Sequence, residues 1–371
     1  FGQNASGIAE LRVKGKKGAE VKLTPSELIT SENQPSQGAS GSPYTFSYIL
    51  KGDGIETWQP KFTYYGFRYV KVEGAVPPGT AGGENAEMVE LNMLHNRNSS
   101  PETGSFSCSY ELFNRTFNLI NYAIKSNFQS VLTDCPHREK LGWLEQTHLM
   151  GSSVHFNFDI HELYRKQVND MMEAQLPNGL VPDIAPEFVP FEGGFRDSPE
   201  WGSAAVILPW LVYKWYGDIS VMQKAWPMMT KYVNYLQMKS ENHIVSHGLG
   251  DWFDYGPKQP GEAQLTPKAL TATAIYYYDV KLLAEMAGIL QKTKEQKKFE
   301  NWASDIKTAF NQRFFNAEKG IPPEARLPWQ CRCVWDWWMK PIKREYCKTS
   351  RIPSVPREIR SQPAMWDSVT W

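Results

Sequence analysis

One short segment of the chain concentrates side chains that could donate or accept a proton. Residues 133–146 read Thr-Asp-Cys-Pro-His-Arg-Glu-Lys-Leu-Gly-Trp-Leu-Glu-Gln. Its charged and aromatic side chains of interest are Asp134, Arg138, Glu139, Trp143 and Glu145. An aromatic surface beside a carboxyl group excludes water and raises the pKa, as a proton donor needs, whereas a neighbouring Arg lowers it. The residue types alone therefore leave the protonation state of Glu139 open.

A pair of carboxyl groups is what the hydrolysis of a glycosidic bond requires. One carboxyl group protonates the leaving oxygen, and the other activates water or attacks the sugar. A structural alternative explains the same residues, since Asp134 could cap a turn and Glu139 with Lys140 could belong to a solvated surface. The spacing by itself does not decide between the two.

The elements around this segment fall into two groups. Residues 1–95 contain short alternating apolar runs separated by Gly and Pro, which predicts strands and a β-sandwich. Residues 96–104 form a polar linker. Apolar residues then recur at helical spacing, which predicts helices over 110–129, 147–175, 200–217, 219–239, 267–290 and 293–315. Two loops between these helices, 176–199 and 241–265, are long enough to carry function.

Composition excludes several classes of partner. The 40 basic and 40 acidic residues give a net charge of zero, so we expect no nucleic acid to bind. The five cysteines show no metal-ligand spacing, and we expect neither a metal nor a cofactor. No run approaches the ~18 apolar residues of a membrane span. Aromatic residues make up 13 % of the chain, and we expect most of them in the core.

The segment Asp134-Cys-Pro-His-Arg-Glu-Lys-Leu-Gly-Trp143 resembles the signature of the bacterial α-L-rhamnosidases of glycoside hydrolase family 78. That signature reads Asp-Cys-Pro-x-Arg, then one or two residues ending in Glu, then Arg or Lys and Leu-Gly-Trp. The resemblance continues in chain order: Gly179–Pro186 looks like the family's substrate loop, and Asp197–Ala205 and Gly248–Trp252 are similar to later stretches. It covers about residues 1–320.

The resemblance implies a fold and a reaction. The family is an (α/α)6 barrel that inverts the anomeric configuration, so we expect a β-sandwich part followed by an incomplete (α/α)6 toroid. The expected substrates are terminal α-L-rhamnosides of plant or bacterial glycans. Glu139 would be the general acid, and Asp134 and Arg138 would hydrogen-bond the rhamnose hydroxyls. The side chains expected to contact the sugar ring or its methyl group are Trp143, Trp201 and Trp252, with Asp251 as a further polar contact.

Two departures from the family pattern affect this interpretation. The family often continues as Trp-x-Gly-Asp, with the Asp contacting substrate, whereas this chain has Gln146 at that position. We expect Glu145 to take over the contact. The family's general base is a Glu far downstream, and no counterpart occurs in this chain. We therefore expect the general base to be absent and this chain by itself to be inactive.

Residues 321–371 differ in character from the rest of the chain. They crowd Trp, Cys and seven prolines into a stretch without helical periodicity. We interpret this as a slip of the reading frame near Gly320, because reading one nucleotide earlier gives a family-like amphipathic helix. The predicted organisation is an N-terminally truncated β-sandwich domain over 1–95, the linker over 96–104, a partial barrel over 105–320 and an out-of-frame tail over 321–371.

Structural alternatives stay open for several of these residues. Trp201 and Trp252 could be core aromatics, and Asp251 could be a turn residue. We interpret His137 as a surface or packing residue. A further group of acidic side chains could line sugar subsites, but we expect it to be solvated; its members are Glu187, Glu192, Asp197 and Glu200.

Two other functions fit the same pattern. The chain could belong to another toroidal sugar enzyme, either a hydrolase or a uronate lyase, or to a non-catalytic carbohydrate-binding protein. The expected partner in each case is a sugar, and for the favoured function it is a rhamnose-containing oligosaccharide or glycoside. The sequence predicts no oligomeric state. The resemblance favours a periplasmic or extracytoplasmic location and leaves the cytoplasm open.

Overall fold

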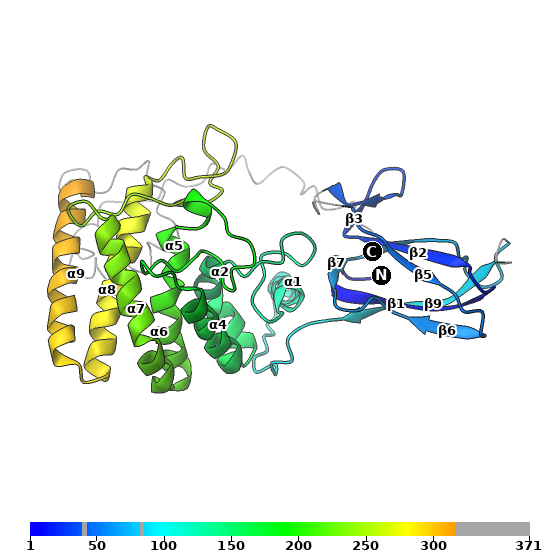
Figure 1. Ribbon diagram of the computed structural model, residues 1–371, viewed down its shortest axis with the longest axis horizontal. Helices are drawn as coiled ribbons and strands as arrows, with labels where there is room; N and C mark the ends of the chain where they lie inside the picture. The colour runs from blue at the N-terminus through cyan, green and yellow to red at the C-terminus, as the bar shows by residue number, and fades with distance from the viewer. Residues whose placement is uncertain (39–42, 82–84, 316–371) are drawn as a thin grey trace. The chain divides into compact units, whose positions relative to one another are not determined.

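The structure is a computed structural model that describes residues 1–38, 43–81 and 85–315. Strands occupy the first part of the chain and helices the second (Figure 1). The strands are β1 (Ala5–Gly15), β2 (Glu20–Ser26), β3 (Leu28–Ile29), β4 (Pro35–Ser36), β5 (Phe46–Ile49), β6 (Ile55–Trp58), β7 (Tyr65–Phe67), β8 (Tyr69–Glu73) and β9 (Ala86–His95). The predicted mixture of an N-terminal β part and a helical part is confirmed.

The strands form two main antiparallel sheets that share one core. The first sheet has the order β6-β1-β7, with β9 also paired to β1, and the second has the order β5-β2-β8. Side chains alternate between the two faces of a strand, so every second residue of β1 and β2 points inward. Leu11 and Val13 of β1 therefore meet Val21 and Leu23 of β2 in a single apolar cluster. A short third ladder joins β3 to β4.

The helical part begins at α1 and contains two long loops. Its helices are α1 (Glu111–Asn127), α2 (Leu144–Leu149), α3 (Gly151–Asn157), α4 (His161–Ala174), α5 (Pro199–Gly202), α6 (Ala204–Tyr216), α7 (Ile219–Lys239), α8 (Lys268–Ile289) and α9 (Thr293–Phe314), with a 3-10 turn η2 (Gly193–Phe195). The helices predicted over 110–129, 219–239, 267–290 and 293–315 are confirmed. The predicted long loops lie between α4 and α5 and between α7 and α8.

The single helix predicted over 147–175 is wrong, because the chain forms three helices there. It leaves the helical conformation at Phe158, where φ is −138° and ψ is 149°. Phe158 instead pairs with Glu102 in an isolated antiparallel bridge, and the next amide, that of Asp159, donates to the carbonyl oxygen of Pro101. These partners lie some fifty residues earlier in the chain, so local periodicity does not reveal the break.

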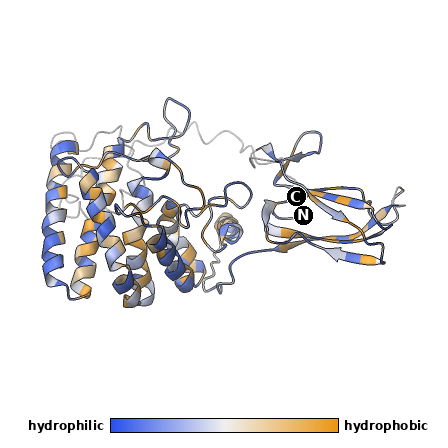
Figure 2. Cartoon of the chain, in the orientation of Figure 1, coloured by the Kyte–Doolittle hydropathy of each residue, from blue (hydrophilic) through white to orange (hydrophobic). Residues whose placement is uncertain are grey.

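Burial explains which helices read as amphipathic and which do not. α6 is apolar almost throughout and packs against α2, α4, α7 and α8, which cover several of its faces. α9 buries one stripe, from Phe299 to Phe310, and carries many Lys and Glu residues elsewhere. Figure 2 shows this as hydrophilic residues along α9, and Figure 1 shows α7, α8 and α9 alongside one another. Within the described part of the chain, every helix is too short or too polar to cross a lipid bilayer.

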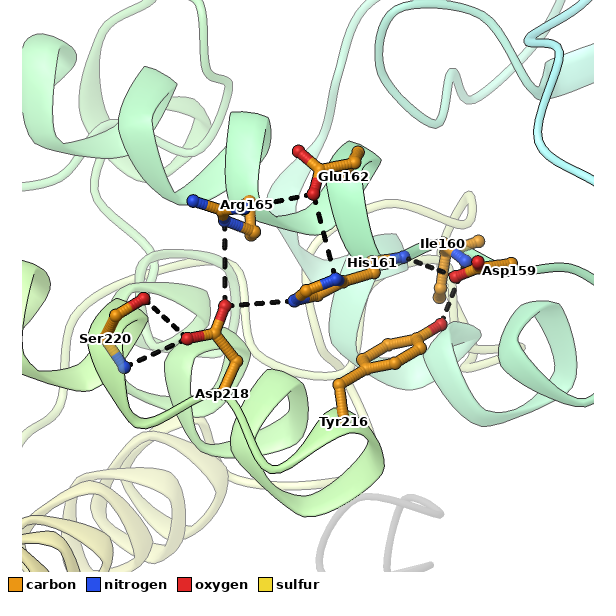
Figure 3. Close-up of polar contacts among 8 residues, drawn as sticks. All are labelled: Asp159, Ile160, His161, Glu162, Arg165, Tyr216, Asp218 and Ser220. Atoms are coloured by element: carbon orange, nitrogen blue, oxygen red, sulfur yellow. Dashed lines mark hydrogen bonds and ion pairs between the residues drawn. The ribbon is translucent and has the colours of Figure 1, made fainter.

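A cluster of polar side chains joins the start of α4 to the turn between α6 and α7 (Figure 3). Gly217 ends α6 with φ of 70°, and Asp218 then caps α7 by accepting the Ser220 amide at 3.0 Å. The second oxygen of Asp218 lies 3.0 Å from Nε2 of His161 and 3.7 Å from Nε of Arg165, both on α4. Hydrogen bonds from Ser220 and the interaction with His161 lower the pKa of Asp218.

We expect Asp218→Ala to lower the free energy of unfolding by about 1–2 kcal/mol, because it removes both the cap of α7 and the contacts to α4. Asp218→Asn should lower the free energy of unfolding by less, because the side-chain oxygen of Asn can still accept the Ser220 amide although the negative charge is lost. Urea unfolding at neutral pH measures both changes. Glu162→Ala is the matched control, because Glu162 belongs to the same cluster but is mostly exposed. An Asp218→Ala variant as stable as the control variant would contradict the cap.

Candidate active site

The chemistry-bearing segment forms a closed loop just before α2, which we call the acid loop (residues 134–143). The amide of Asp134 donates to the carbonyl oxygen of Leu141 at 3.2 Å, and Oδ1 of Asp134 accepts the Leu141 amide at the same distance. Inside the loop the amide of Glu139 donates to Sγ of Cys135 at 3.3 Å. Asp134 thus makes the turn contact of the structural alternative; a sugar contact for its other oxygen stays a prediction.

The carboxylate of Glu139 is held by two donors and is still accessible. Its Oε2 accepts the indole N–H of Trp143 at 2.9 Å, and its Oε1 accepts Nη2 of Arg138 at 3.1 Å. Its side chain is 35 % exposed. A ligand could therefore reach this carboxyl group, as a general acid requires. The structure brings Asp134, Arg138, Glu139 and Trp143 together in one loop, and their roles stay predictions.

Two carboxyl groups of the acid loop influence each other. Burial raises the pKa of Asp134, and this outweighs a hydrogen bond from Cys135, which lowers it. The negative charge of nearby Glu139 and a hydrogen bond with it raise the pKa of Asp134 further. Like charges in close proximity disfavour the ionised form, so the Glu139 carboxylate adds to the effect of burial on the pKa of Asp134.

A row of aromatic rings links the acid loop to the second long loop. Trp143 stacks on Phe191 with centroids 5.3 Å apart, and Phe191 lies 6.3 Å from Phe195. Phe195 meets Trp252 edge-on at 5.1 Å, and Trp252 is 37 % exposed. Phe191 and Phe195 are not among the residues predicted from the sequence, although the aromatic content of the loop 176–199 is a signal for them. An exposed row of ring faces and edges suits an apolar face of a sugar.

The remaining predicted residues have more varied surroundings. Glu145 lies in the first turn of α2 and is half-buried, beside Gln146. Trp201 is 4 % exposed and belongs to the helical core, so its contact with a sugar stays a prediction. Asp251 is half-buried next to Trp252, and burial raises its pKa. Residues 321–371, the predicted out-of-frame tail, lie outside the described residues.

The two long loops are tied to each other at Asp197. Its Oδ1 lies 3.0 Å from Nε2 of His247, and its Oδ2 accepts the hydroxyl of Tyr235 at 2.5 Å and lies 3.0 Å from Nζ of Lys239. Hydrogen bonds and the charge of His247 outweigh burial and lower the pKa of Asp197 to about 2. The adjacent Ser198 hydroxyl accepts the Leu249 amide at 2.9 Å. A charged carboxylate therefore locks the loop 176–199 to the loop 241–265.

The expectation that the acidic residues of this region are solvated is wrong for three of them, Asp197, Glu200 and Glu187. Asp197 is paired as described, and Glu200 is 1 % exposed in α5. Glu187 is ion-paired with Arg196 at 2.7 Å, whereas Glu192 is exposed as expected. Asp197 and Glu200 are covered by residues of other elements, so their surroundings could not be read from the local sequence, whereas the partner of Glu187 lies in the same loop.

Two of the acids are almost completely buried, Asp183 within the loop 176–199 and Glu200 in α5. Glu200 and Asp183 each keep at least one side-chain oxygen without a hydrogen-bond partner, and burial raises the pKa of both. Oδ1 of Asp183 accepts the Ser198 amide at 2.9 Å. Burial lowers the pKa of His148 to about 4, and its Nε2 lies 2.8 Å from the carbonyl oxygen of Glu200. Burial thus favours the neutral form of all three groups.

No group of three or more potential metal ligands occurs within residues 1–38, 43–81 and 85–315. Cys108 and Cys135 are free thiols. His137, expected to be a surface or packing residue, has Nδ1 3.1 Å from Oε2 of Glu27. The sequence thus located the acid loop, whereas the aromatic row and the loop lock became visible only in three dimensions.

Comparison with known proteins gives a consistent match over the chain. Residues 1–94 match the family model described as bacterial alpha-L-rhamnosidase concanavalin-like domain, and residues 101–332 match the bacterial alpha-L-rhamnosidase 6 hairpin glycosidase domain. An alpha-L-rhamnosidase of Formosa agariphila is 32 % identical over 332 residues, covering 85 % of this chain and 34 % of the relative. One of Streptomyces avermitilis is 31 % identical over 295 residues, covering 79 % of this chain and 27 % of the relative.

Solved structures agree with these matches. The alpha-L-rhamnosidase from Dictyoglumus thermophilum has a TM-score of 0.76 at 33 % identity, covering 85 % of this chain and 35 % of that chain. The Streptomyces avermitilis enzyme complexed with L-rhamnose has a TM-score of 0.73 at 27 % identity, covering 92 % of this chain and 33 % of that chain. The chain spans about a third of the length of the curated relatives.

We expect the Asp197 lock to make stability depend on pH in acid. Because the pKa of Asp197 is about 2 in the fold and about 4 in an unfolded chain, its contribution is complete above about pH 4 and is lost as the pH falls through about 2. Urea unfolding of the wild type and Asp197→Asn at pH 6 and pH 2.5 isolates this contribution. The wild type should be more stable than Asp197→Asn at pH 6, and this difference in the free energy of unfolding should be smaller by about 1–2 kcal/mol at pH 2.5.

Glu192→Gln is the control for this experiment, because Glu192 is an exposed acid in the same loop. Its difference from the wild type should stay the same at both pH values. An Asp197→Asn variant whose difference from the wild type does not change with pH would show that the carboxylate is not held in its charged form.

Proposed function

The chain belongs to the bacterial α-L-rhamnosidase family, and we propose from this that it forms part of an inverting glycoside hydrolase that removes terminal α-L-rhamnosyl groups. The observation that carries the proposal is the accessible carboxyl group of Glu139, held by Trp143 and Arg138 within the acid loop. The proposed fold of the whole catalytic part is an (α/α)6 toroid, to which α1 to α9 contribute.

Glu139 acts as the general acid in this proposal. It protonates the glycosidic oxygen as the bond to the anomeric carbon breaks, while water attacks from the opposite face of the sugar. An inverting pair of carboxyl groups needs about 6.5–9.5 Å between its members to hold that water. Asp134 is within hydrogen-bonding reach of Glu139, which is too close for the base. Asp134 therefore serves the acid and the sugar hydroxyls, together with Arg138.

The proposed ligand is a rhamnose-containing oligosaccharide or glycoside. Rhamnose carries a methyl group at C6, so its surface is more apolar than that of most hexoses. Trp143 and the exposed part of Trp252 offer the row of rings on which such a face would rest, with Asp251 and Glu145 as polar contacts. The burial of Trp201 leaves it only a small surface for the same contact.

The general base is not among the residues that we assign. We propose that it lies in sequence that the longer relatives have and this chain lacks, and that this chain alone does not complete the reaction. The proposed slip of the reading frame near Gly320 belongs to the same explanation. Expression of the frame-restored, full-length gene beside this chain tests it, because only the longer product should hydrolyse an aryl α-L-rhamnoside.

In that full-length protein we expect Glu139→Gln to reduce kcat on a rhamnoside with a poor leaving group by about 10²–10⁴-fold. The loss should be much smaller for a dinitrophenyl rhamnoside, because a good leaving group departs without protonation. Steady-state kinetics with both substrates measure this difference. Glu162→Gln is the control, since Glu162 is exposed on α4.

Equal losses on the two leaving groups would argue against a role as the acid. Unchanged turnover in Glu139→Gln would remove the assignment altogether. If the protein converts a uronate to an unsaturated product and does not hydrolyse a rhamnoside, the proposed reaction is wrong and the protein is a lyase.

A further inference from the structure

The residue that follows the proposed general acid is bound by two tyrosines. Nζ of Lys140 donates to the carbonyl oxygen of Tyr64 at 2.6 Å. It also lies 3.7 Å from the ring centroid of Tyr65 and 4.8 Å from that of Tyr64. We call the two rings and this carbonyl group the tyrosine cage. The cage lies at the start of β7, about seventy residues before the acid loop in the chain.

The cage holds a cation that water solvates poorly. Burial lowers the pKa of Lys140 to about 8, and burial raises the pKa of Tyr64 to about 12. Ring faces and a carbonyl oxygen carry partial negative charge, so they replace part of the lost hydration. Among the described carboxylates none forms an ion pair with Lys140. The cage thus binds Lys140 without using the carboxylate of Glu139 or Asp134.

The other end of the acid loop contacts the same strand. The amide of Gly66 donates to the carbonyl oxygen of Pro136 at 2.9 Å. A side chain at Gly66 would not fit, because its Cβ would come within 2.6 Å of Cγ of Pro136. Pro136 and Lys140 therefore both contact the segment at β7, and Glu139 lies between them in the chain.

The backbone of Lys140 has a conformation that is unfavourable for a lysine. Its φ is 57°, in the left-handed region that residues other than Gly, Asn and Asp seldom adopt. Such a conformation persists when surrounding contacts determine it. The tyrosine cage is the contact that holds the Lys140 side chain here.

We propose that Lys140 is a positioning residue: the tyrosine cage fixes it on β7 and thereby holds the Glu139 carboxylate against the indole N–H of Trp143. The inference rests on the proposed role of Glu139 as the acid, and it gives the β part of the chain a part in catalysis. A proton donor acts efficiently only when its geometry is fixed closely, so a loop fastened at two points suits the task.

Hydrogen exchange measured by NMR on this chain tests the proposal without requiring hydrolysis. Two protons report on it: the Gly66 amide, which contacts the acid loop, and the Trp143 indole N–H, which contacts Glu139. Lys140→Met keeps the length of the side chain and removes its charge, and Lys140→Arg keeps the charge. Lys166→Met is the matched control, because Lys166 pairs with Asp170 on the distant surface of α4.

In Lys140→Met both reporting protons should exchange about tenfold faster, while amides of β1 stay unchanged. Lys140→Arg should restore slow exchange, and the control should match the wild type. Tyr65→Leu removes the ring from the other side and should give the same acceleration. The double variant should add little to either single variant, because both changes break one contact.

Exchange rates within twofold of the wild type in Lys140→Met and in Tyr65→Leu would overturn the inference. Equal acceleration of the β1 amides would overturn it too, since that would show a general loss of stability. The proposed function fails separately, by unchanged turnover in Glu139→Gln of the full-length protein. The two tests therefore distinguish an unfastened loop from a wrongly assigned acid.

Discussion

The hydrogen bond between the Trp143 indole and the Glu139 carboxylate is the contact on which the arrangement of the site depends. Trp143 is the N-cap residue of α2, and it pairs with Ile184 in an isolated bridge. The next amide, that of Leu144, donates to the carbonyl oxygen of Asp183 at 2.8 Å. The indole is thus fixed by the helical core on one side and by the loop 176–199 on the other. The Glu139 carboxylate therefore accepts a hydrogen bond from a donor whose position is set by contacts on both sides.

The distribution of charge around this contact follows from the partners that each acid has. Burial raises the pKa of Asp134, Asp183 and Glu200, which have few donors facing them. Asp197 is also largely buried, but His247 and other donors lower its pKa to about 2. Burial thus favours the neutral form of these three acids, whereas the donors around Asp197 favour its charged form. A buried carboxyl group either shifts its pKa upward or needs donors that stabilise its charge.

Local sequence predicted the elements whose determinants are local. Apolar residues recur at helical spacing in α1, α7 and α9, α8 is a long run of apolar and small residues, and the acid loop was found from its residue types. The break at Phe158, the burial of Glu200 and the tyrosine cage depend on partners that lie 50 or more residues away, or in another element. Nothing in the spacing of charged residues distinguishes a solvated acid from one that a distant His or Tyr will meet. Family resemblance supplied roles for residues, but not their surroundings.

The physical contacts give a reason for each residue in the second half of the acid loop. Lys140 fills the tyrosine cage, and Leu141 is buried and closes the loop through its backbone. A side chain at position 142 would crowd the loop, because the Cβ of any residue replacing Gly142 would lie 3.0 Å from the carbonyl oxygen of Ala185. Trp143 supplies the donor for the carboxylate. The run Lys-Leu-Gly-Trp therefore determines the conformation of the loop around Glu139. The proposed role of Glu139 depends on that conformation, because it places the carboxylate against the indole N–H of Trp143. In a loop of the same composition without these contacts, the glutamate carboxylate would be hydrated by water and would not be held in one orientation.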